Sequence, residues 1–480
     1  MRFIVKISSE SFVKSRSVRK WHIKQLRRNI EKVLQMVDST VQVRGLWDRL
    51  EIDCAENKMA TCRRRLGDIP GISTILTVDS AVLPQQNPLE FLAEKALAYY
   101  AEQVNGKSFV VRCRRAGEHS FRSVDVNRFV GAALLENSTD SRVQMKDAEV
   151  TVAIEILRDK AYFVREKFTG LRGYPFGTQG TVLSLISGGF DSSVASYLMM
   201  RRGCRVNFLF FNLGGVAHSL GAQQAALYLW QKFGSSHSAR FYSVSLDRFI
   251  AQMMQLPHTT YNGVLLKRAM LRVAEDIANR TNIEALVTGE CLSQVSSQTL
   301  ANLSVIDRVT DQLVVRPLIT MEKEDIISIA EQIGSATFAR NMVEYCGVIS
   351  NKPTVSAALK SLQEIEQEMG NEWFEAAVES IENIAVADII KNANARPQVE
   401  FIYELSGHTL IDIRETAQPL EQAELHIPFH QLNQRFPSLP QDKSYLLYCD
   451  KGVMSQLHAA YLHELGFNNV KVYRQPGSAF

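Results

Sequence analysis

The chain has 480 residues, 46% of them hydrophobic and 22% charged, and its 54 Lys and Arg against 51 Asp and Glu give a formal net charge of +3. At roughly 100–200 residues per domain this length predicts two to four domains, and the composition excludes disordered, collagen-like and repeat proteins. The sequence has no apolar run long enough for a transmembrane helix and no secretory leader, so we expect a cytoplasmic protein without a membrane partner. The 7 cysteines fit neither a disulfide framework nor zinc spacing, and no residue is assigned to a metal.

Positive charge is concentrated in the first third of the chain. Residues 1–150 hold 25 basic and 18 acidic residues, a net charge of +7, whereas residues 151–396 carry −1 and residues 397–480 carry −3. A single charge run is most often a solvated helix face, but arginines also cluster at 63–65 and between 112 and 128. We therefore predict that this part of the protein contacts the phosphates of a nucleic acid.

The first 170 residues predict two small units that mix helices and strands. Residues 2–7 alternate as a strand and residues 19–36 carry apolar side chains at helical spacing. A turn signal at 68–72 ends the first unit. The other expected elements are strands near 41–43 and 50–52, a helix over 88–102, a strand over 108–115, a helix over 125–136, and strands near 149–155 and 161–165.

From residue 182 the pattern changes to short strands that are apolar throughout and alternate with helices. Such strands are buried on both faces, which is typical of a doubly wound parallel sheet. The acidic segment 354–395 is expected to be helical, as a packed extension or a semi-rigid linker, and a last α/β segment follows residue 397. The expected strands of the sheet are 182–186, 206–211, 241–246, 285–288 and 313–315, with helices over 192–202, 221–233 and 263–280.

The most informative string is LSLISGGFDSS at 183–193, where an apolar strand runs into a Ser-Gly-Gly turn and a helix start. The glycines let backbone N–H groups approach an anion, and the helix N-terminus adds free donors and its dipole. The string lacks the Walker A lysine and the third glycine of a dinucleotide fingerprint. It resembles instead the PP-loop of ATP pyrophosphatases, which cleave ATP to AMP and pyrophosphate to adenylate an acceptor. The resemblance implies that Asp191 is catalytic and orients Mg²⁺ or water.

The same resemblance assigns an ATP site. It implies that Leu185, Ile186, Gly289 and Gln298 surround the adenine, with Lys267 near the phosphates. Gly289 ends an expected strand, which is where open α/β sheets bind ligands. The full expected nucleotide-binding set is Leu185, Ile186, Ser187, Gly188, Gly189, Asp191, Ser192, Ser193, Lys267, Gly289 and Gln298.

A second site is expected near the carboxyl terminus. A strand over 445–448 delivers Cys449 into the loop CDKGVMS, and a helix follows from residue 456. Backbone N–H donors, the loop lysine and the helix N-terminus would stabilise a thiolate or persulfide anion there. A lone cysteine is more often a small buried residue, but the position at a turn makes burial in a core less expected. Together with Asp412 and Arg414 on another strand, this loop resembles a shortened rhodanese domain.

A basic domain, a PP-loop domain and a rhodanese domain in this order resemble the ThiI family of tRNA uridine 4-sulfurtransferases. The resemblance covers nearly the whole chain and includes the strings FNLGG at 211–215, VSSQT at 295–299 and EYCGVIS at 344–350. The domains it implies are a ferredoxin-like domain at 1–60, a THUMP RNA-binding domain at 61–167, a PP-loop ATP pyrophosphatase domain at 175–350, a helical extension or linker at 351–397, and a rhodanese domain at 402–480.

The family resemblance implies a reaction in two halves. ATP and Mg²⁺ adenylate O4 of a tRNA uridine, position 8 in the family, and a persulfide on Cys449 displaces AMP to give 4-thiouridine. An IscS-type cysteine desulfurase loads the persulfide, Cys346 resolves it as a disulfide with Cys449, and a reductant reopens the disulfide. Family members with a rhodanese domain also supply sulfur for the thiazole of thiamine, which implies a ThiS-type carrier protein as a further partner. The loop lacks the arginine pattern of rhodaneses that use thiosulfate.

Two other interpretations remain open from the sequence. The first is another PP-loop ligase that adenylates RNA, although no glutaminase segment is present to make it an amidotransferase. The second is a scaffold that binds RNA and carries sulfur without catalysis. The intact loop at 187–193 and Lys267 argue against the scaffold.

Overall fold

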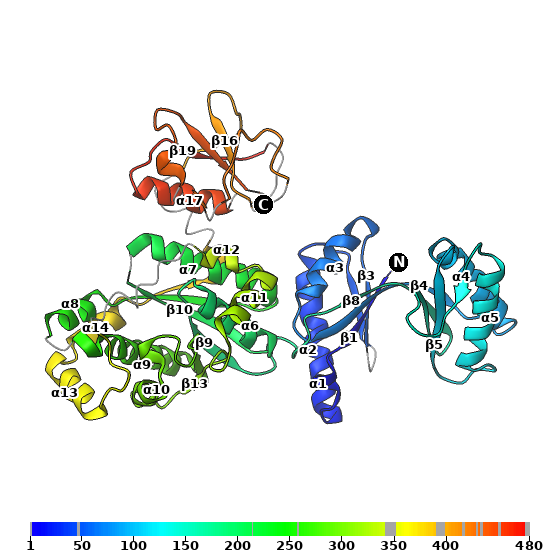
Figure 1. Ribbon diagram of the computed structural model, residues 1–480, viewed down its shortest axis with the longest axis horizontal. Helices are drawn as coiled ribbons and strands as arrows, with labels where there is room; N and C mark the ends of the chain where they lie inside the picture. The colour runs from blue at the N-terminus through cyan, green and yellow to red at the C-terminus, as the bar shows by residue number, and fades with distance from the viewer. Residues whose placement is uncertain are drawn as a thin grey trace. The chain divides into compact units, whose positions relative to one another are not determined.

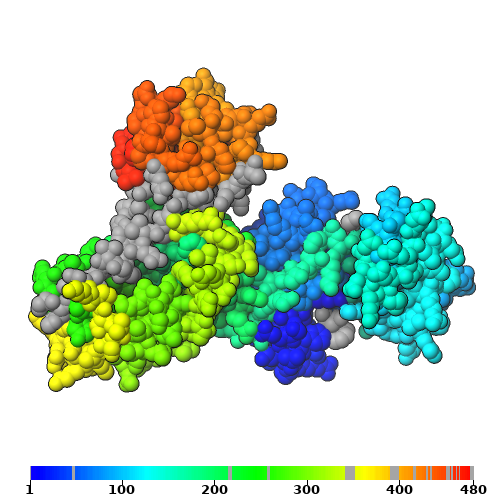
Figure 2. Space-filling view, viewed as in Figure 1, coloured from blue at the N-terminus to red at the C-terminus, as the bar shows by residue number. Residues whose placement is uncertain are grey.

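The computed structural model describes the chain except for residues 1, 46–48, 214, 257–258, 341–351, 390–398, 415–417, 429–430, 433–434, 450–452 and 476–480. The described residues form two compact units (Figure 1). One unit comprises Met1–Thr178 with Arg201–Gly203, and the other comprises Gln179–Met200 with Cys204–Phe480. Figure 2 gives the same view as a surface, with the chain coloured from blue at its amino terminus to red.

The amino-terminal part of the first unit is built around strand β1 (Arg2–Ile7). It pairs antiparallel with β3 (Arg49–Asp53) on one side and with β4 (Ile72–Val82) on the other. Helix α2 (Arg16–Gln35) packs its apolar stripe on these strands, and the Ser15 hydroxyl caps it by accepting from the Val18 N–H. The other elements here are α1 (Ser9–Phe12), β2 (Gln42–Gly45) and α3 (Met59–Gly67).

The rest of the first unit packs two helices against the same sheet. Helices α4 (Pro88–Val104) and α5 (Ser123–Glu136) share a core with three of the strands in this part, β5 (Ser108–Ala116), β7 (Val150–Leu157) and β8 (Lys160–Thr169) (Figure 1). Strand β6 (Arg142–Val143) follows α5, and the sheet order is β2-β3-β1-β4-β8-β7-β5-β6.

The sequence pattern does not predict β4, which joins the two halves of this sheet by pairing with β1 and β8. The reason is that β4 is buried on both faces at its centre. Ile75 packs into one core cluster and Leu76 into another, so the alternation that marks a half-buried strand is lost.

The second unit contains the predicted doubly wound sheet. Its strand order is β13-β12-β9-β10-β11-β14, and all pairs are parallel except the last. The chain moves from β9 outward to one side and later returns to pair β12 on the other side, so the strand order reverses between β9 and β12. Ligands bind at such switch points. The parallel strands are β9 (Thr181–Leu185), β10 (Arg205–Asn212), β11 (Arg240–Ser245), β12 (Ala285–Val287) and β13 (Leu313–Val315).

Helices cover both faces of this sheet (Figure 1). They supply the apolar side chains that pack on the buried strands, as the alternating pattern predicts. The helices are α6 (Phe190–Arg201), α7 (Gly215–Leu229), α8 (Asp247–Gln255), α9 (Asn262–Thr281), α10 (Leu300–Asp307), α11 (Lys323–Ile333) and α12 (Ala336–Ala339).

The acidic segment that was expected to be a helical extension or linker contains two helices and also a strand. Helices α13 (Leu359–Met369) and α14 (Glu372–Glu379) bury apolar residues, including Leu362 and Trp373, in the core of the parallel sheet. Strand β14 (Glu382–Ala385) then adds to the sheet edge, antiparallel to β11. The sequence pattern does not predict this strand of four residues, because its pairing is long-range and its side chains are half-exposed or exposed.

The carboxyl-terminal part has its own five-stranded parallel sheet and its own core. The sheet order is β15-β19-β18-β16-β17, and helix α17 (Val453–Glu464) follows β18. The strands are β15 (Phe401–Ile402), β16 (Thr409–Asp412), β17 (Leu425–His426), β18 (Tyr445–Tyr448) and β19 (Val470–Tyr473). Throughout the part of the chain that the structure describes, no helix is long and apolar enough to cross a membrane.

A buried carboxylate joins strands from the two halves of the first unit. Glu155 on β7 pairs with Lys6 on β1 and with Arg49 on β3, whose Nη1 lies 2.7 Å from Glu155 Oε2. Burial alone would raise the pKa of Glu155, but the two cations outweigh it and hold that pKa below its usual range.

We predict that Glu155→Gln lowers the stability of this sheet by about 2–3 kcal/mol at pH 7, less than for a fully buried pair because Lys6 keeps partial access to water. Because the native pKa is depressed, this stability is present above the ordinary glutamate pKa of about 4.3 and is lost as pH falls through the native value. The difference in stability between native protein and variant should therefore shrink as pH falls below the ordinary glutamate pKa and through the lower native pKa of Glu155.

Amide hydrogen exchange of β7 and β8 peptides in the full chain measures this difference locally. Glu166→Gln is the matched control, because Glu166 makes only an exposed pair with Arg63 at 3.4 Å and should change little. Equal protection of β7 in both variants at pH 7 would contradict the prediction.

Candidate functional site

A cavity of about 310 Å³ opens at the carboxyl ends of β9 and β12. Its walls come from the turn after β9, the segment after β12, and helix α9. Gly188 and Ser193 of the expected nucleotide set are not among its lining residues. The expected residues that do line it are Leu185, Ile186, Ser187, Gly189, Asp191, Ser192, Lys267, Gly289 and Gln298.

The turn between β9 and α6 has the geometry of an anion cradle. Gly188 adopts a φ of +81°, which favours glycine, and the Ser192 hydroxyl accepts from the Ser187 N–H at 3.1 Å. Ser193 is fully buried behind the turn. Because α6 begins at Phe190, directly after the turn, the first N–H groups of the helix have no acceptor within the helix, which suits a phosphate bound beside the turn.

Gly289 allows the segment after β12 to touch the start of α6. A Cβ atom on Gly289 would lie 2.7 Å from the Asp191 carbonyl carbon and 2.8 Å from the Ser192 nitrogen. Any side chain there would push these two walls of the cavity apart. This close approach is a packing reason for a glycine at the end of β12.

Asp191 is held by two side chains from distant parts of the chain. Its carboxylate oxygens lie 2.7 and 2.9 Å from Lys323 Nζ, and Gln294 Nε2 donates to Oδ2 at 3.0 Å. Lys323 is the first residue of α11 and was missed by sequence reasoning. The one available signal was its place at the start of a helix that follows the last parallel strand.

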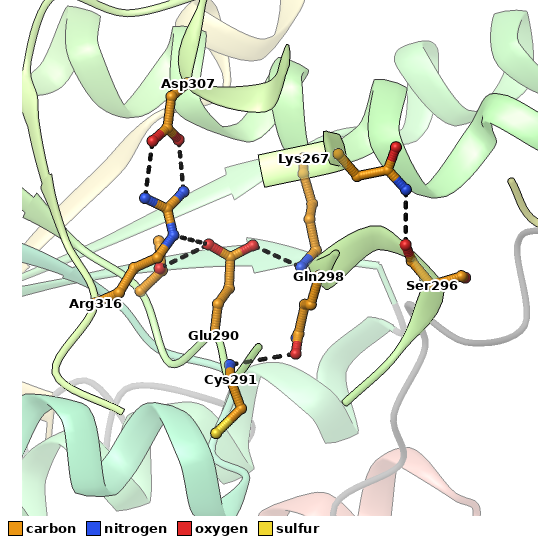
Figure 3. Close-up of polar contacts among 9 residues, drawn as sticks. Lys267, Glu290, Cys291, Ser296, Gln298, Asp307 and Arg316 are labelled. Carbon is orange, nitrogen blue, oxygen red and sulfur yellow. Dashed lines mark hydrogen bonds and ion pairs between the residues drawn. The ribbon is translucent and has the colours of Figure 1, made fainter. Parts of the chain in front are cut away.

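A chain of ion pairs runs from the other side of the cavity into the protein (Figure 3). Lys267 Nζ lies 2.6 Å from Glu290 Oε1, and Arg316 Nε lies 2.7 Å from Glu290 Oε2. Arg316 also binds both oxygens of Asp307, at 2.9 and 2.5 Å. Burial would raise the pKa of Glu290, but Lys267 and Arg316 keep it below the usual range, so the carboxyl is ionised.

Gln298 is fixed in the same region from the backbone. Its Oε1 accepts from the Cys291 N–H at 3.2 Å (Figure 3). The Cys291 thiol in turn donates to the carbonyls of Leu318 and Met321, both at 3.0 Å. These contacts tie the wall that carries Gln298 to the turn before Lys323.

The carboxyl-terminal sheet presents Cys449 directly after β18. The expectation that this thiol escapes the core is wrong, because Cys449 is only 8% exposed and packs within the core of its own sheet. The reason is that Ser455, near the start of α17, covers the sulfur. The Ser455 N–H donates to Cys449 Sγ at 3.4 Å and the Ser455 hydroxyl lies at the same distance.

The acidic and basic residues expected beside this cysteine pair with each other. Asp412 is fully buried at the end of β16, and Arg414 Nη2 binds it at 2.6 Å. Burial would raise the pKa of Asp412, but Arg414 and backbone N–H groups hold it below its usual range. Cys346, the expected resolving residue, and residues 450–452 of the cysteine loop lie outside the described residues.

The basic residues of the first unit are largely on its surface. Arg16, Lys20, Lys24 and Arg28 are exposed at four-residue spacing along α2. The arginines of β5 are partly used within the unit, since Arg112 donates to a backbone carbonyl at 2.7 Å. The α2 surface therefore offers the longer stretch of accessible positive charge.

The cavity suits a nucleotide triphosphate with its cation. The N–H groups of its turn and the Lys267 ammonium match phosphate oxygens, and Asp191, which is paired with Lys323, supplies one carboxylate. Mg²⁺ is commonly bound by one or two carboxylates together with substrate phosphates. Among the described residues, no group of three or more His, Cys, Asp or Glu side chains could hold a metal ion by itself.

Four family models match the chain in sequence order. They are the ThiI ferredoxin-like domain at residues 2–75, the THUMP domain at 88–164, the thiamine biosynthesis protein (ThiI) model at 177–370 and the rhodanese-like domain at 395–475. The matched sequence of domains is the one that the motifs predict.

Curated relatives and a solved structure extend this match over the whole chain. The tRNA sulfurtransferase of Marinobacter nauticus is 44% identical over 98% of this chain and 99% of its own length, and that of Shigella dysenteriae serotype 1 is 43% identical over 99% and 100%. The crystal structure of a 4-thiouridine synthetase–RNA complex with bound ATP covers 80% of this chain and 99% of its own, with 25% identity and a TM-score of 0.71. The chain therefore belongs to the ThiI family of tRNA sulfurtransferases.

Proposed function

We propose that this tRNA sulfurtransferase uses ATP to replace O4 of a tRNA uridine with sulfur, giving 4-thiouridine, at position 8 as in its family. The observation that carries the proposal is the cavity at the β9–β12 switch point, where the phosphate turn, Asp191 and Lys267 meet. The solved relative with bound RNA and ATP supports both substrates for this chain.

The first half of the reaction makes the uracil oxygen a leaving group. O4 attacks the α-phosphorus of ATP, pyrophosphate departs, and the oxygen remains as part of AMP. The N–H groups of the turn and the Lys267 ammonium stabilise the negative charge that moves onto the phosphates, and Lys323 holds Asp191 in place beside them. Mg²⁺, held by Asp191 and phosphate oxygens, would supply further positive charge there.

The second half delivers sulfur from Cys449. A cysteine desulfurase of the IscS type transfers the terminal sulfur that makes the Cys449 persulfide. That sulfur attacks C4 and displaces AMP, and the Cys346 thiolate then attacks Cys449 Sγ. A Cys346–Cys449 disulfide forms, the electron pair of the broken S–S bond stays on the uracil sulfur, and a cellular dithiol must reduce the disulfide before the next turnover.

The first unit binds the tRNA. Its net charge of +7 over residues 1–150 and the exposed cations of α2 support contacts with phosphates. The protein acts in the cytoplasm, where tRNA, ATP and reductant occur together. Transfer of the same persulfide sulfur to a ThiS-type carrier would serve synthesis of the thiamine thiazole.

Sulfur transfer from ³⁵S-cysteine to unmodified tRNA, with a desulfurase and ATP present, tests the proposal directly. We expect labelled 4-thiouridine and one AMP per thiolation, and Cys449→Ala should reduce multiple-turnover labelling to background because the carrier sulfur is lost. Cys113→Ala is the matched control, since Cys113 lies in the first unit on β5, and it should keep normal labelling. Continued turnover and labelling in Cys449→Ala would refute the sulfur route, while thiolation without AMP would refute the ATP step.

Asp191→Asn should separate the two halves of the reaction. Loss of the carboxylate removes the partner of Lys323 and the proposed cation ligand, so tRNA thiolation should fall by about 10²–10³-fold. Loading of persulfide on Cys449, measured by mass spectrometry, should be unchanged because it does not use the cavity. A parallel loss of both activities would instead indicate a general folding defect.

The disulfide step is tested by reductant dependence. Native protein without a dithiol should stop after about one turnover, with Cys346 and Cys449 joined in one crosslinked peptide. Cys346→Ala should give slow thiolation and no crosslinked peptide. If Cys346→Ala turned over at the native rate without added reductant, the proposed resolving step would be wrong.

A further inference from the structure

Glu290 lies in the wall of the cavity, but neighbouring side chains bind its carboxylate. It follows Gly289 at the end of β12 and is only 7% exposed. Both of its carboxylate oxygens are bound. Lys267 takes Oε1, while Arg316 and the Thr288 hydroxyl, at 2.9 Å, take Oε2 (Figure 3).

We propose that Glu290 is a positioning residue that fixes the Lys267 ammonium at the cavity wall for the phosphates of ATP. Arg316, which is itself held by Asp307, pairs with Glu290 and keeps the Glu290 carboxylate ionised and oriented. The inference rests on the proposed function, in which Lys267 meets the phosphates.

A lysine needs such an anchor more than an arginine does. Its ammonium is a point charge at the end of a flexible four-carbon stem, so holding one rotamer costs side-chain entropy. The ion pair with Glu290 orders the Lys267 side chain before ATP binds, so this entropy is not lost on binding. An ammonium has three donors, and Oε1 of Glu290 occupies one of them, which leaves donors for phosphate oxygens.

The ion pairs of Arg316 with Glu290 and Asp307 explain why a buried carboxylate can stay ionised and hold Lys267. Lys267, Glu290, Arg316 and Asp307 alternate in charge, so the four side chains together carry no net charge. Arg316 is not among the residues that line the cavity. Its guanidinium is committed to Glu290 and, at both ends of its fork, to Asp307, so it acts on the ligand only through Lys267.

The neighbouring residue on α9 provides an internal comparison. Arg268 is also paired with a glutamate, since its Nε and Nη2 bind the two oxygens of Glu366 at 2.6 and 2.8 Å. The Arg268 side chain is 3% exposed and does not line the cavity. This pair fastens α13 to α9, whereas the pair one residue earlier faces the ligand.

Glu290→Gln in the full-length protein tests the proposal. The amide keeps the size of the side chain but loses the charge that holds Lys267. We expect the KM for ATP to rise by about 10–100-fold, with smaller change in kcat, while the KM for tRNA and the loading of persulfide on Cys449 stay as in the native protein. In Glu366→Gln the thermal midpoint should fall and the KM for ATP should not change.

A double-mutant cycle distinguishes positioning from a general structural role. If Glu290 acts through Lys267, Glu290→Gln should add little to the defect of Lys267→Met. A full additional penalty in the Lys267→Met background, or an unchanged KM for ATP in Glu290→Gln, would overturn the inference. If Lys267→Met itself left ATP use unaffected, the proposed role of Lys267 would fail instead.

Asp307→Asn keeps the test decisive if Glu290→Gln does not fold. Asp307 lies at the outer end of the network with a side chain 42% exposed, so its replacement should be tolerated. Releasing Arg316 should raise the KM for ATP by a smaller factor than the loss of Glu290. No change in that KM would then count against the proposal.

Discussion

The close contact between Gly289 and the start of α6 is the constraint on which the nucleotide site depends. The carboxyl end of β12 and the turn after β9 meet there with no space for a single methyl group. This contact follows from the parallel pairing of β12 with β9, which brings residues about one hundred positions apart to the same sheet edge. The turn offers N–H groups, and the segment after β12 brings Glu290 and, through it, Lys267.

Charge in the cavity is provided in balanced pairs. Lys323 is paired with Asp191 on one side, and Lys267 is paired with Glu290 on the other. An ammonium without a carboxylate partner at either place would add uncompensated positive charge to the empty protein. The carboxylates compensate that charge and leave the Lys267 ammonium with donors for a phosphate, so the site is organised before the polyanionic ligand enters.

Local sequence was enough to predict the parts of the site that sit on one strand–turn–helix. The string at 183–193 predicts its own geometry because the glycines, the apolar strand and the helix start are contiguous. Lys323 could not be found in this way, because its partner Asp191 is 132 residues away and no local pattern marks the pairing. Strands β4 and β14 were missed for a related reason, since their burial is decided by neighbours that are distant in sequence.

Within the described residues, the two sites present different donors to negative charge, and this difference fits their proposed tasks. Phosphates carry several charges and must be stabilised as they leave, and the cavity lining offers the full cation of Lys267 for this. A persulfide carries one charge and must remain a nucleophile. Around Cys449, within the described residues, the sulfur meets the neutral N–H and hydroxyl of Ser455, while the nearby cation Arg414 is bound to Asp412. The described donors are therefore neutral, whereas Lys451, the cation that the sequence predicts for this loop, lies outside the described residues.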